Sequence, residues 1–337
     1  MRQATQTDRV RIGCLGAARI APAALFKPAR ASAEVDATAV AARDPERARS
    51  FAAKHGVPVV HTSYDELLGD SDVDAVYNPL PNGLHGLWTI RALEAGKHVL
   101  REKPFTANAA EAERVAAAAD RSGLVVMEAF HWRYHPLARR MLEIIDRGEL
   151  GPIRHIETTM CFPLFKRSDI RWQLDLAGGA LMDAGCYTVH MLRTLAGDEP
   201  EVVSADAKLR APGVDRVMQA DMRFADGRTG RIRTSMWSSS VLKMAARVEG
   251  ERGTLSVFNP VAPQYFHRMT VKVDGKRRRE RVKGGSTYSY QLQAFADAVL
   301  RGAPTLTPPT DSTANMRVID DIYRAAGMEP RRGATDS

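Results

Sequence analysis

The stretch RVRIGCLGAARIA, residues 9–21, joins a short apolar run to a glycine turn and an alanine-rich segment. A strand that ends at a glycine and opens into a helix is typical of the first βα junction of a dinucleotide-binding unit. Read from Gly16, the turn has the spacing G-x-A-x-x-A, in which Ala18 and Ala21 replace two glycines of the usual pattern. Such a turn can present the N–H groups of a helix N-terminus to a pyrophosphate, although an ordinary βα turn is the alternative. The residues predicted to bind phosphate are Gly16, Ala17, Ala18, Arg19 and Ile20.

Strand and helix patterns alternate from this turn to about residue 130. The strand patterns are RVRIGCLG, VDATAVAARD, DAVYNPLP, HVLREKP and LVVMEAF, and helical patterns separate them. Short connections between alternating strands and helices indicate parallel βαβ units. The sequence therefore predicts an α/β fold whose N-terminal domain, residues 1–130, is a Rossmann unit with a doubly wound parallel sheet.

The pattern changes in the remaining residues, 131–337. Strand-like segments joined by short turns run from IRHIETTMCF to MTVKVDGKRRRERVK, and the segment GGALMDAGCYTVHMLRTLAG interrupts them as a helix. Consecutive strands of this kind predict an α+β domain built on a mostly antiparallel sheet. Two further helical patterns close the chain, and the last of them could pack back on the first domain.

The composition is that of a globular protein and argues against several classes. Of the 337 residues, 44% are hydrophobic and 26% are charged, which suits two domains with real cores. Three cysteines are too few for a disulfide framework, and neither a signal peptide nor a bilayer-spanning apolar stretch is recognisable. The net charge of +8 comes partly from residues 273–283, which read as a charged hairpin without interleaved aromatic residues. We therefore expect a cytoplasmic protein that binds neither membrane nor nucleic acid.

The end of the second predicted strand, AVAARDPER, bears on the choice of dinucleotide. An NAD site usually has an acidic residue at this point, where it binds the ribose hydroxyls. This chain instead has Ala42 followed by Arg43, and a guanidinium can pair with a 2′-phosphate. The sequence predicts NADP in preference to NAD, with Arg43 as the selecting residue. The alternative is that Arg43 is a surface residue and Asp44 is only a helix cap.

The segment HVLREKPF, residues 98–105, places a lysine just after the apolar residues of a predicted strand. The carboxyl ends of parallel strands face the ligand crevice of a doubly wound sheet. An ammonium group there can hydrogen-bond a substrate hydroxyl and favour its alkoxide. From composition alone, the simpler interpretation of Lys103 is a solvated loop lysine paired with Glu102.

Four segments together carry a resemblance to a known family: GCLGAARIA, AVAARDPERA, YNPLPNGLHGLWTIRALEAGKHVLREKP and GGALMDAGCYTVHMLR. From about residue 10 to about residue 327 the chain resembles the Gfo/Idh/MocA oxidoreductases, and within them the subgroup of dimeric dihydrodiol dehydrogenases and NADP-dependent xylose dehydrogenases. The resemblance implies that Lys103 of the E-K-P tripeptide is catalytic or positions the substrate. It also implies a homodimer or homotetramer. The further cofactor contacts expected in these segments are Leu80, Asn82, His85, Glu102 and Lys103 itself.

The segment MDAGCYTVH places Asp183, Tyr187 and His190 at offsets that share one face of an α-helix. Many members of the family have histidine in place of Tyr187, and the resemblance to the dihydrodiol dehydrogenases implies that this tyrosine is the general acid/base. A neighbouring cation such as Lys103 can lower the pKa of a tyrosine. Asp183 would then fix Tyr187 or a substrate hydroxyl. The alternative is a buried helix in which Tyr187 packs and Asp183 caps.

The remaining candidates are expected to contact the substrate, although the two arginines and the tryptophan among them are equally consistent with interdomain packing. They are Arg133, Arg171, Trp172 and His190. The best candidate for a metal site, His131 with His135 four residues later, lacks a supporting pattern of cysteines or carboxylates. No metal site is therefore predicted.

These patterns and the resemblance predict an NADP-dependent oxidoreductase. It would transfer a hydride between nicotinamide and a secondary alcohol or carbonyl of a sugar, polyol or cyclic diol. Lys103 would polarise the substrate oxygen, and Tyr187 would exchange the proton. Two alternatives use the same fold: a non-catalytic regulator that senses the cofactor, and an NAD-dependent glycoside hydrolase. The regulator would need neither Lys103 nor Tyr187, and both are present.

Overall fold

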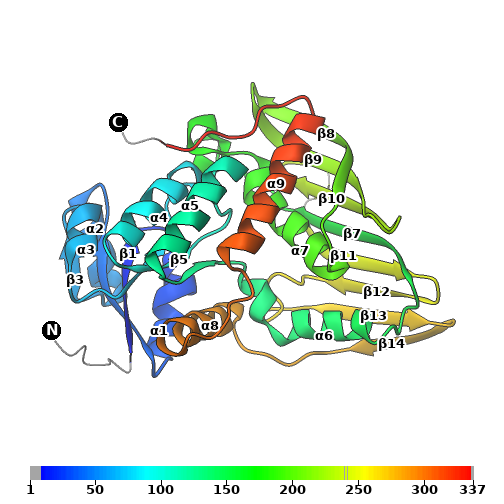
Figure 1. Cartoon of the computed structure of the whole chain (residues 1–337), viewed down its shortest axis with the longest axis horizontal. Helices are drawn as coiled ribbons and strands as arrows, with labels where there is room; N and C mark the ends of the chain where they lie inside the picture. Colours follow the sequence, from blue (N-terminus) through cyan, green and yellow to red (C-terminus); the bar gives the residue numbers. More distant parts are fainter. Residues whose placement is uncertain (1–8, 239, 241, 335–337) are drawn as a thin grey trace.

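A computed structural model describes residues 9–238, 240 and 242–334 (Figure 1), so the polar tail, residues 1–8, lies outside the described part. The first part of the chain forms a six-stranded sheet in the order β3-β2-β1-β4-β5-β6, in which neighbouring strands are parallel. This is the doubly wound order of a Rossmann unit, so the prediction of the N-terminal fold is confirmed. The strands are β1 Val10–Leu15, β2 Val35–Ala41, β3 Val59–His61, β4 Ala75–Asn78, β5 His98–Arg101 and β6 Val126–Glu128.

The helices of this unit begin where the sequence provides caps. Asp44 accepts hydrogen bonds from the N–H groups of Glu46 and Arg47 at the start of α2, and Asn108 accepts one from Glu111 in α5. The sequence patterns do not predict β3 and α3, because three and six residues are too few to show a period. The helical segments are a π-helical turn Pro22–Phe26 that continues as α1 Lys27–Arg30, then α2 Pro45–His55, α3 Tyr64–Gly69, α4 His85–Glu94 and α5 Ala109–Ser122.

After α6, Pro136–Asp146, the chain builds an eight-stranded sheet in the order β14-β13-β12-β11-β7-β10-β9-β8. β7 and β10 pair in parallel and the other neighbouring strands are antiparallel, which confirms the predicted mostly antiparallel sheet. The strands are β7 Ile153–Cys161, β8 Glu201–Ala211, β9 Val214–Arg223, β10 Thr229–Ser235, β11 Lys243–Gly250, β12 Gly253–Phe258, β13 Arg268–Val273 and β14 Lys276–Glu280.

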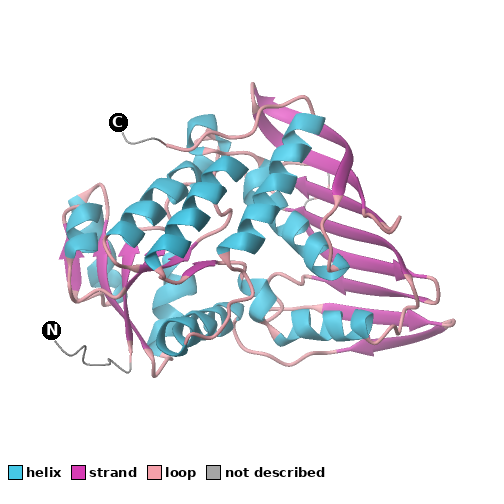
Figure 2. Ribbon diagram, viewed as in Figure 1, coloured by secondary structure: helices cyan, strands magenta, loops and turns pink. Residues whose placement is uncertain are grey.

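Helices connect the two sheets, which lie at opposite ends of the molecule (Figure 2). α7, Cys186–Ala196, packs on β7 and β10, and α9, Pro309–Ala325, packs on β8 and also on α5 of the first domain. α8, Thr287–Arg301, packs on α1, where Leu292 and Phe295 share a core with residues of β1. The end of the chain therefore contacts both sheets. Within the described residues, no helix has the length and apolarity needed to cross a membrane.

Candidate active site

The turn after β1 has the shape and the donors of a phosphate-binding turn. Gly16 has a φ of 95°, a left-handed conformation that favours glycine, and a Cβ atom there would lie 3.2 Å from Cδ2 of Leu80. Within the described part of the chain, the N–H groups of residues 17–20 donate to no acceptor. Adjacent N–H groups without acceptors at a helix N-terminus suit an anionic group such as a pyrophosphate. The structure thus brings Leu80 and the predicted turn together.

Two arginines lie beside this turn at the end of β2. Arg43 is exposed, and Arg47, one helical turn further on, donates a 2.8 Å hydrogen bond from Nη2 to the carbonyl oxygen of Ala17. The carboxylate of Asp44 caps the N-terminus of α2 and accepts hydrogen bonds of 3.0 and 3.2 Å from the N–H groups of Glu46 and Arg47. The sequence analysis missed Arg47, although it lies in the first turn of the helix that directly follows Arg43 and Asp44.

The loop after β4 contains three of the predicted cofactor residues. His85 is 1% exposed, and its ring nitrogens lie 2.8 and 2.7 Å from the carbonyl oxygens of Pro104 and Leu80. These contacts tie the loop to the segment after Lys103. The predicted contact of His85 with the cofactor stays a prediction. Asn82 donates a 3.1 Å hydrogen bond to the carbonyl oxygen of Ala177 in the second domain.

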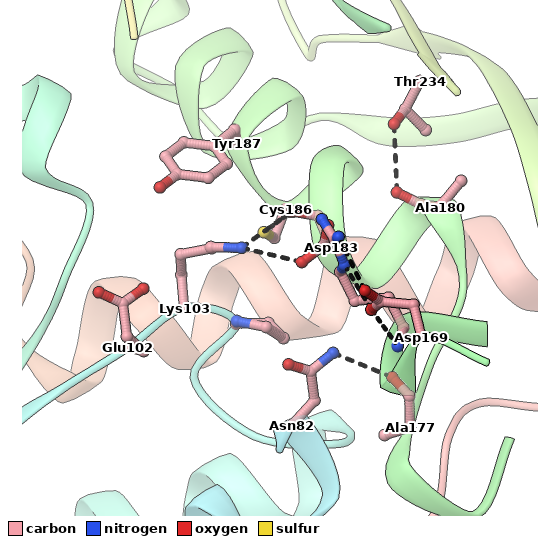
Figure 3. A network of polar contacts seen from close by, with 12 residues as sticks. Asn82, Glu102, Lys103, Asp169, Ala177, Ala180, Asp183, Cys186, Tyr187 and Thr234 are labelled. Carbon is pink, nitrogen blue, oxygen red and sulfur yellow. Dashed lines mark hydrogen bonds and ion pairs between the residues drawn. The ribbon is translucent and has the colours of Figure 1, made fainter. Parts of the chain in front are cut away.

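Lys103 lies at the carboxyl end of β5, between Glu102 and Asp183 (Figure 3). Its Nζ is 3.0 Å from the carbonyl oxygen and 3.2 Å from Oδ1 of Asp183, with 15% of the side chain exposed. Burial, the largest single influence, lowers the pKa of Lys103, but the charges of Asp183, Cys186 and Glu102 and the hydrogen bond to Asp183 together outweigh burial and raise it. The buried Glu102 accepts a 2.7 Å hydrogen bond from Tyr77. Lys103 is therefore a fixed ammonium group, not a solvated loop lysine.

A chain of charged groups continues from Asp183 to the phosphate turn. Arg171 contacts Asp183 at 3.4 Å and Asp169 at 2.9 Å, and Asp169 also pairs with Arg19 of the turn at 3.0 Å. Although burial would raise it, hydrogen bonds from Arg171 lower the pKa of Asp169 to about 2. The structure therefore directs Arg19, a predicted phosphate residue, toward the second domain, and it places Arg171 beside Lys103.

Asp183 and Tyr187 flank Lys103 without contacting each other. Residues 181–185 form a π-helical turn before α7, so the predicted α-helical face does not hold across this segment. Asp183 binds Lys103, whereas the Tyr187 ring lies with its centroid 5.2 Å from Lys103 Nζ. Within the protein, Asp183 thus fixes Lys103 rather than Tyr187, and its alternative contact with a substrate hydroxyl stays a prediction.

The hydroxyl of Tyr187 has a partner that the sequence analysis did not assign to it. Its Oη lies 3.1 Å from Nε2 of His131, which directly follows the loop after β6. Burial, together with the charge of Glu102, raises the pKa of Tyr187 well above 10. The expected lowering by Lys103 is therefore wrong for this arrangement, because the ammonium faces the ring and Tyr187 is 5% exposed.

Three further predicted residues contact groups other than Lys103 in the described structure. His190 is 1% exposed, accepts a hydrogen bond from Trp132 and pairs with Asp311, so its side chain has protein partners, and its contact with substrate stays a prediction. Burial lowers the pKa of Arg133. The carboxylate whose charge acts on Arg133 is that of Asp311, so Arg133 lies near Asp311. Trp172 packs in a small core of the second domain with Leu164, Ala180, Val214 and Met236.

No group of three or more potential metal ligands is found among the described residues. The nitrogen of His135 instead caps α6 by accepting a hydrogen bond from Leu137, and His131 faces Tyr187. The position of His131 at the carboxyl end of a parallel strand, shared with Lys103, was the signal that could have identified it.

A dinucleotide turn, an ammonium group fixed at the crevice and a buried tyrosine beside it define an oxidoreductase that uses a pyridine dinucleotide. The comparisons agree with this class. The chain matches the oxidoreductase family, NAD-binding Rossmann fold, over residues 10–130 and the GFO/IDH/MocA C-terminal domain over residues 138–256. It therefore belongs to the Gfo/Idh/MocA family, and the expectation from the sequence segments is confirmed.

Named relatives cover almost the whole chain. D-xylose 1-dehydrogenase (NADP(+)) 2 of Haloferax volcanii is 37% identical over 318 residues, which are 93% of this chain and 96% of the relative. Trans-1,2-dihydrobenzene-1,2-diol dehydrogenase of Xenopus tropicalis is 27% identical over 86% of this chain and 89% of its own length. The crystal structure of KijD10, a 3-ketoreductase from Actinomadura kijaniata in complex with NADP and TDP-benzene, has a TM-score of 0.89 at 31% identity, covering 94% of this chain and 98% of that one.

Proposed function

We propose that this enzyme is an NADP-dependent oxidoreductase that acts on a secondary hydroxyl or carbonyl of a sugar, polyol or cyclic diol. The observation that carries the proposal is the convergence of Lys103 and Tyr187 at the carboxyl ends of the parallel strands, 5.2 Å apart from ammonium to ring centroid. Ligands of open α/β sheets bind at this edge. A bound nicotinamide would supply the hydride acceptor or donor.

Lys103 acts on the substrate oxygen through its fixed positive charge. Its raised pKa keeps the amine protonated, so it stabilises a developing alkoxide electrostatically and does not itself shuttle the proton. Asp183 holds the ammonium in place from the second domain, and Arg171 in turn bonds the carboxylate of Asp183. Substrate is therefore polarised by a group that depends on both domains being docked.

Tyr187 exchanges the proton. With its raised pKa the phenol is protonated at neutral pH, so it can donate to a carbonyl oxygen when the substrate is reduced. In the reverse direction the phenolate, formed when Tyr187 has lost its proton, receives the proton of the alcohol. The phenol and the ammonium thus have separate tasks, one of proton exchange and one of charge stabilisation.

Arg43 and Arg47 support NADP as the cofactor. Arg47 bonds Ala17 of the phosphate turn, and Arg43 lies two residues after Ala41, whose carbonyl oxygen accepts from the N–H of Gly16. The carboxylate of Asp44 is engaged in capping α2 rather than directed to a ribose. The named xylose dehydrogenase uses NADP(+), and the ketoreductase structure contains NADP. A 2′-phosphate between two guanidinium groups would account for a preference for NADP over NAD.

An absorbance assay tests the proposal and separates its rivals. Purified protein is incubated with NADP⁺ or NAD⁺ and a panel of aldoses, polyols and cyclic diols, and formation of reduced cofactor is recorded. We expect turnover with NADP⁺. Hydrolysis of a glycoside without net reduction, or cofactor binding without any turnover, would contradict it. The homodimer or homotetramer stays a prediction, which analytical ultracentrifugation tests.

A further inference from the structure

The scheme above leaves one contact of Tyr187 unused. We propose that His131, held in a single tautomer by Thr287, donates a hydrogen bond to the hydroxyl of Tyr187 and so sets its proton affinity. This inference rests on the proposed role of Tyr187 as the proton-exchanging group. His131 does not touch the reacting atoms, so it is a positioning residue.

The contact is buried and well defined. Nε2 of His131 lies 3.1 Å from Oη of Tyr187, and the two residues are 4% and 5% exposed. The imidazole ring also packs on Tyr288 of α8, with ring centroids 4.3 Å apart. Water therefore competes little for either group, and a hydrogen bond in such surroundings is stronger than one in solvent.

Thr287 determines which nitrogen of His131 carries the proton. Its Oγ1 lies 2.8 Å from Nδ1, the residue is fully buried, and within the described chain this hydroxyl has no other polar partner. A buried O–H without an acceptor is costly, and Thr287 is fully buried whereas Tyr187 keeps 5% exposure and has a substrate oxygen as its proposed acceptor, so the Thr287 hydroxyl is the one that donates, to Nδ1. Nδ1 is then the acceptor, and in a neutral imidazole the proton sits on Nε2. Burial, reinforced by the charge of Lys103, lowers the pKa of His131 to about 3, so the ring is neutral.

The tautomer has two consequences for Tyr187. Because Nε2–H donates to Oη, the hydroxyl hydrogen of Tyr187 is left to point toward another acceptor, which in the proposed reaction is the substrate oxygen. When Tyr187 gives up that proton, Nε2–H stabilises the phenolate. The other titratable groups that act on Tyr187 are Glu102, Tyr288, Cys186 and Asp183, all of which oppose its ionisation, and the ammonium of Lys103, which faces its ring.

The test combines spectroscopy with kinetics. Long-range ¹H–¹⁵N NMR of labelled protein reports the tautomer of His131, whose signals are assigned by their loss in His131→Leu. We expect the Nε2–H form. In the kinetic arm, a hydrogen bond to a charged group is lost, so His131→Leu should lower kcat by about 10- to 100-fold. KM should change less than about threefold, since no substrate contact is removed.

The pH profile distinguishes this role from a structural one. Alcohol oxidation needs the phenolate of Tyr187, so the acid limb of kcat follows its pKa in the complex with NADP⁺, where the positive charge of the nicotinamide ring would counteract the upward shift caused by burial. Removal of the Nε2–H donor of His131 should move the acid limb to higher pH by about one unit, which corresponds to a tenfold weaker stabilisation of the phenolate. His131→Gln keeps a side-chain N–H and should restore most of kcat and the original limb. An Nδ1–H tautomer, or a reduced kcat with an unmoved limb, would overturn the proposal.

A second pair of variants distinguishes loss of the hydrogen bond to His131 from a general loss of folding. Thr287→Val removes the hydroxyl that selects the tautomer and should lower kcat about three- to tenfold and move the limb in the same direction. Thr313→Val is the matched control, because the hydroxyl of this buried threonine donates to the carbonyl oxygen of Pro309 in its own helix, α9. Equal profiles for Thr287→Val and Thr313→Val would contradict the role of Thr287. If the unmodified enzyme oxidises no substrate, the proposed function fails, and the NMR tautomer still decides the assignment of His131.

Discussion

Replacement of Lys103 by methionine separates charge from shape at the proposed site. Methionine has a similar length and no charge, so Lys103→Met keeps the volume and removes the ammonium. In the protein as folded, that ammonium sits at hydrogen-bond distance from Asp183, 3.0 and 3.2 Å, and it is aimed at the crevice beside Tyr187. The substitution therefore removes the positive charge on which the substrate alkoxide would depend.

The expected loss follows from Coulomb's law. An ammonium about 3 Å from a full negative charge, at an effective dielectric constant of about 20, contributes about 5 kcal/mol. This corresponds to a decrease in kcat on the order of 10³- to 10⁴-fold. Removing one partner of a largely buried pair also leaves Asp183 with Arg171 alone, so the free energy of unfolding should fall by up to about 3 kcal/mol.

The assay is steady-state turnover at saturating NADP⁺ and substrate, with NADPH affinity measured by fluorescence. Affinity should change less than about threefold, because the phosphate turn and the two arginines are untouched. Lys97→Met is the control: Lys97 is also a buried lysine, but its ammonium bonds the carbonyl oxygens of Asp70 and Val73, away from the crevice. A Lys103→Met enzyme with turnover within tenfold of the parent would refute the electrostatic role.

Three further substitutions test other parts of the account. Arg43→Ala should raise the Kd of NADP about 10- to 100-fold and leave that of NAD unchanged, measured by titration calorimetry; equal losses for both would contradict phosphate selection. Arg331→Met breaks the buried ion pair with Asp215 and should lower the free energy of unfolding, measured in urea, by about 3–5 kcal/mol. A loss below about 1 kcal/mol would contradict a stabilising role of this pair. Burial raises the pKa of Asp320 from 3.8 to about 6, so its stabilising contribution is complete below about pH 4 and is lost as the pH rises through 6. The free energy of unfolding of Asp320→Asn, relative to that of the parent, should therefore rise by about 3 kcal/mol between pH 4 and pH 8. A difference in unfolding free energy that does not change with pH would contradict this.

Both sheets could be predicted from the sequence because their signals are local. Each long strand shows its own alternation, and caps such as Asp44 and Asn108 lie within three residues of the groups they bind. The position of Lys103 at the crevice also follows from local pattern and parallel topology. The short elements β3 and α3 carry no such periodic signal.

The fine structure of the site could not be predicted in this way. A π-helical turn at residues 181–185 changes which side chains share a face, so Asp183 meets Lys103 rather than Tyr187. The partner of His131, Thr287, lies 156 residues away in the chain, and neither residue has a spacing pattern that reveals the contact. Such contacts are set by the docking of α8 on the first domain, which single-segment patterns do not encode.

The most direct measurement is a crystal structure of the enzyme with NADP⁺ and a non-reacting alcohol. The account predicts that one oxygen of the alcohol accepts hydrogen bonds from both Nζ of Lys103 and Oη of Tyr187, with the carbinol carbon stacked over nicotinamide C4. An alcohol bound by neither group, or a nicotinamide ring on the opposite side of the lysine from the tyrosine, would contradict it.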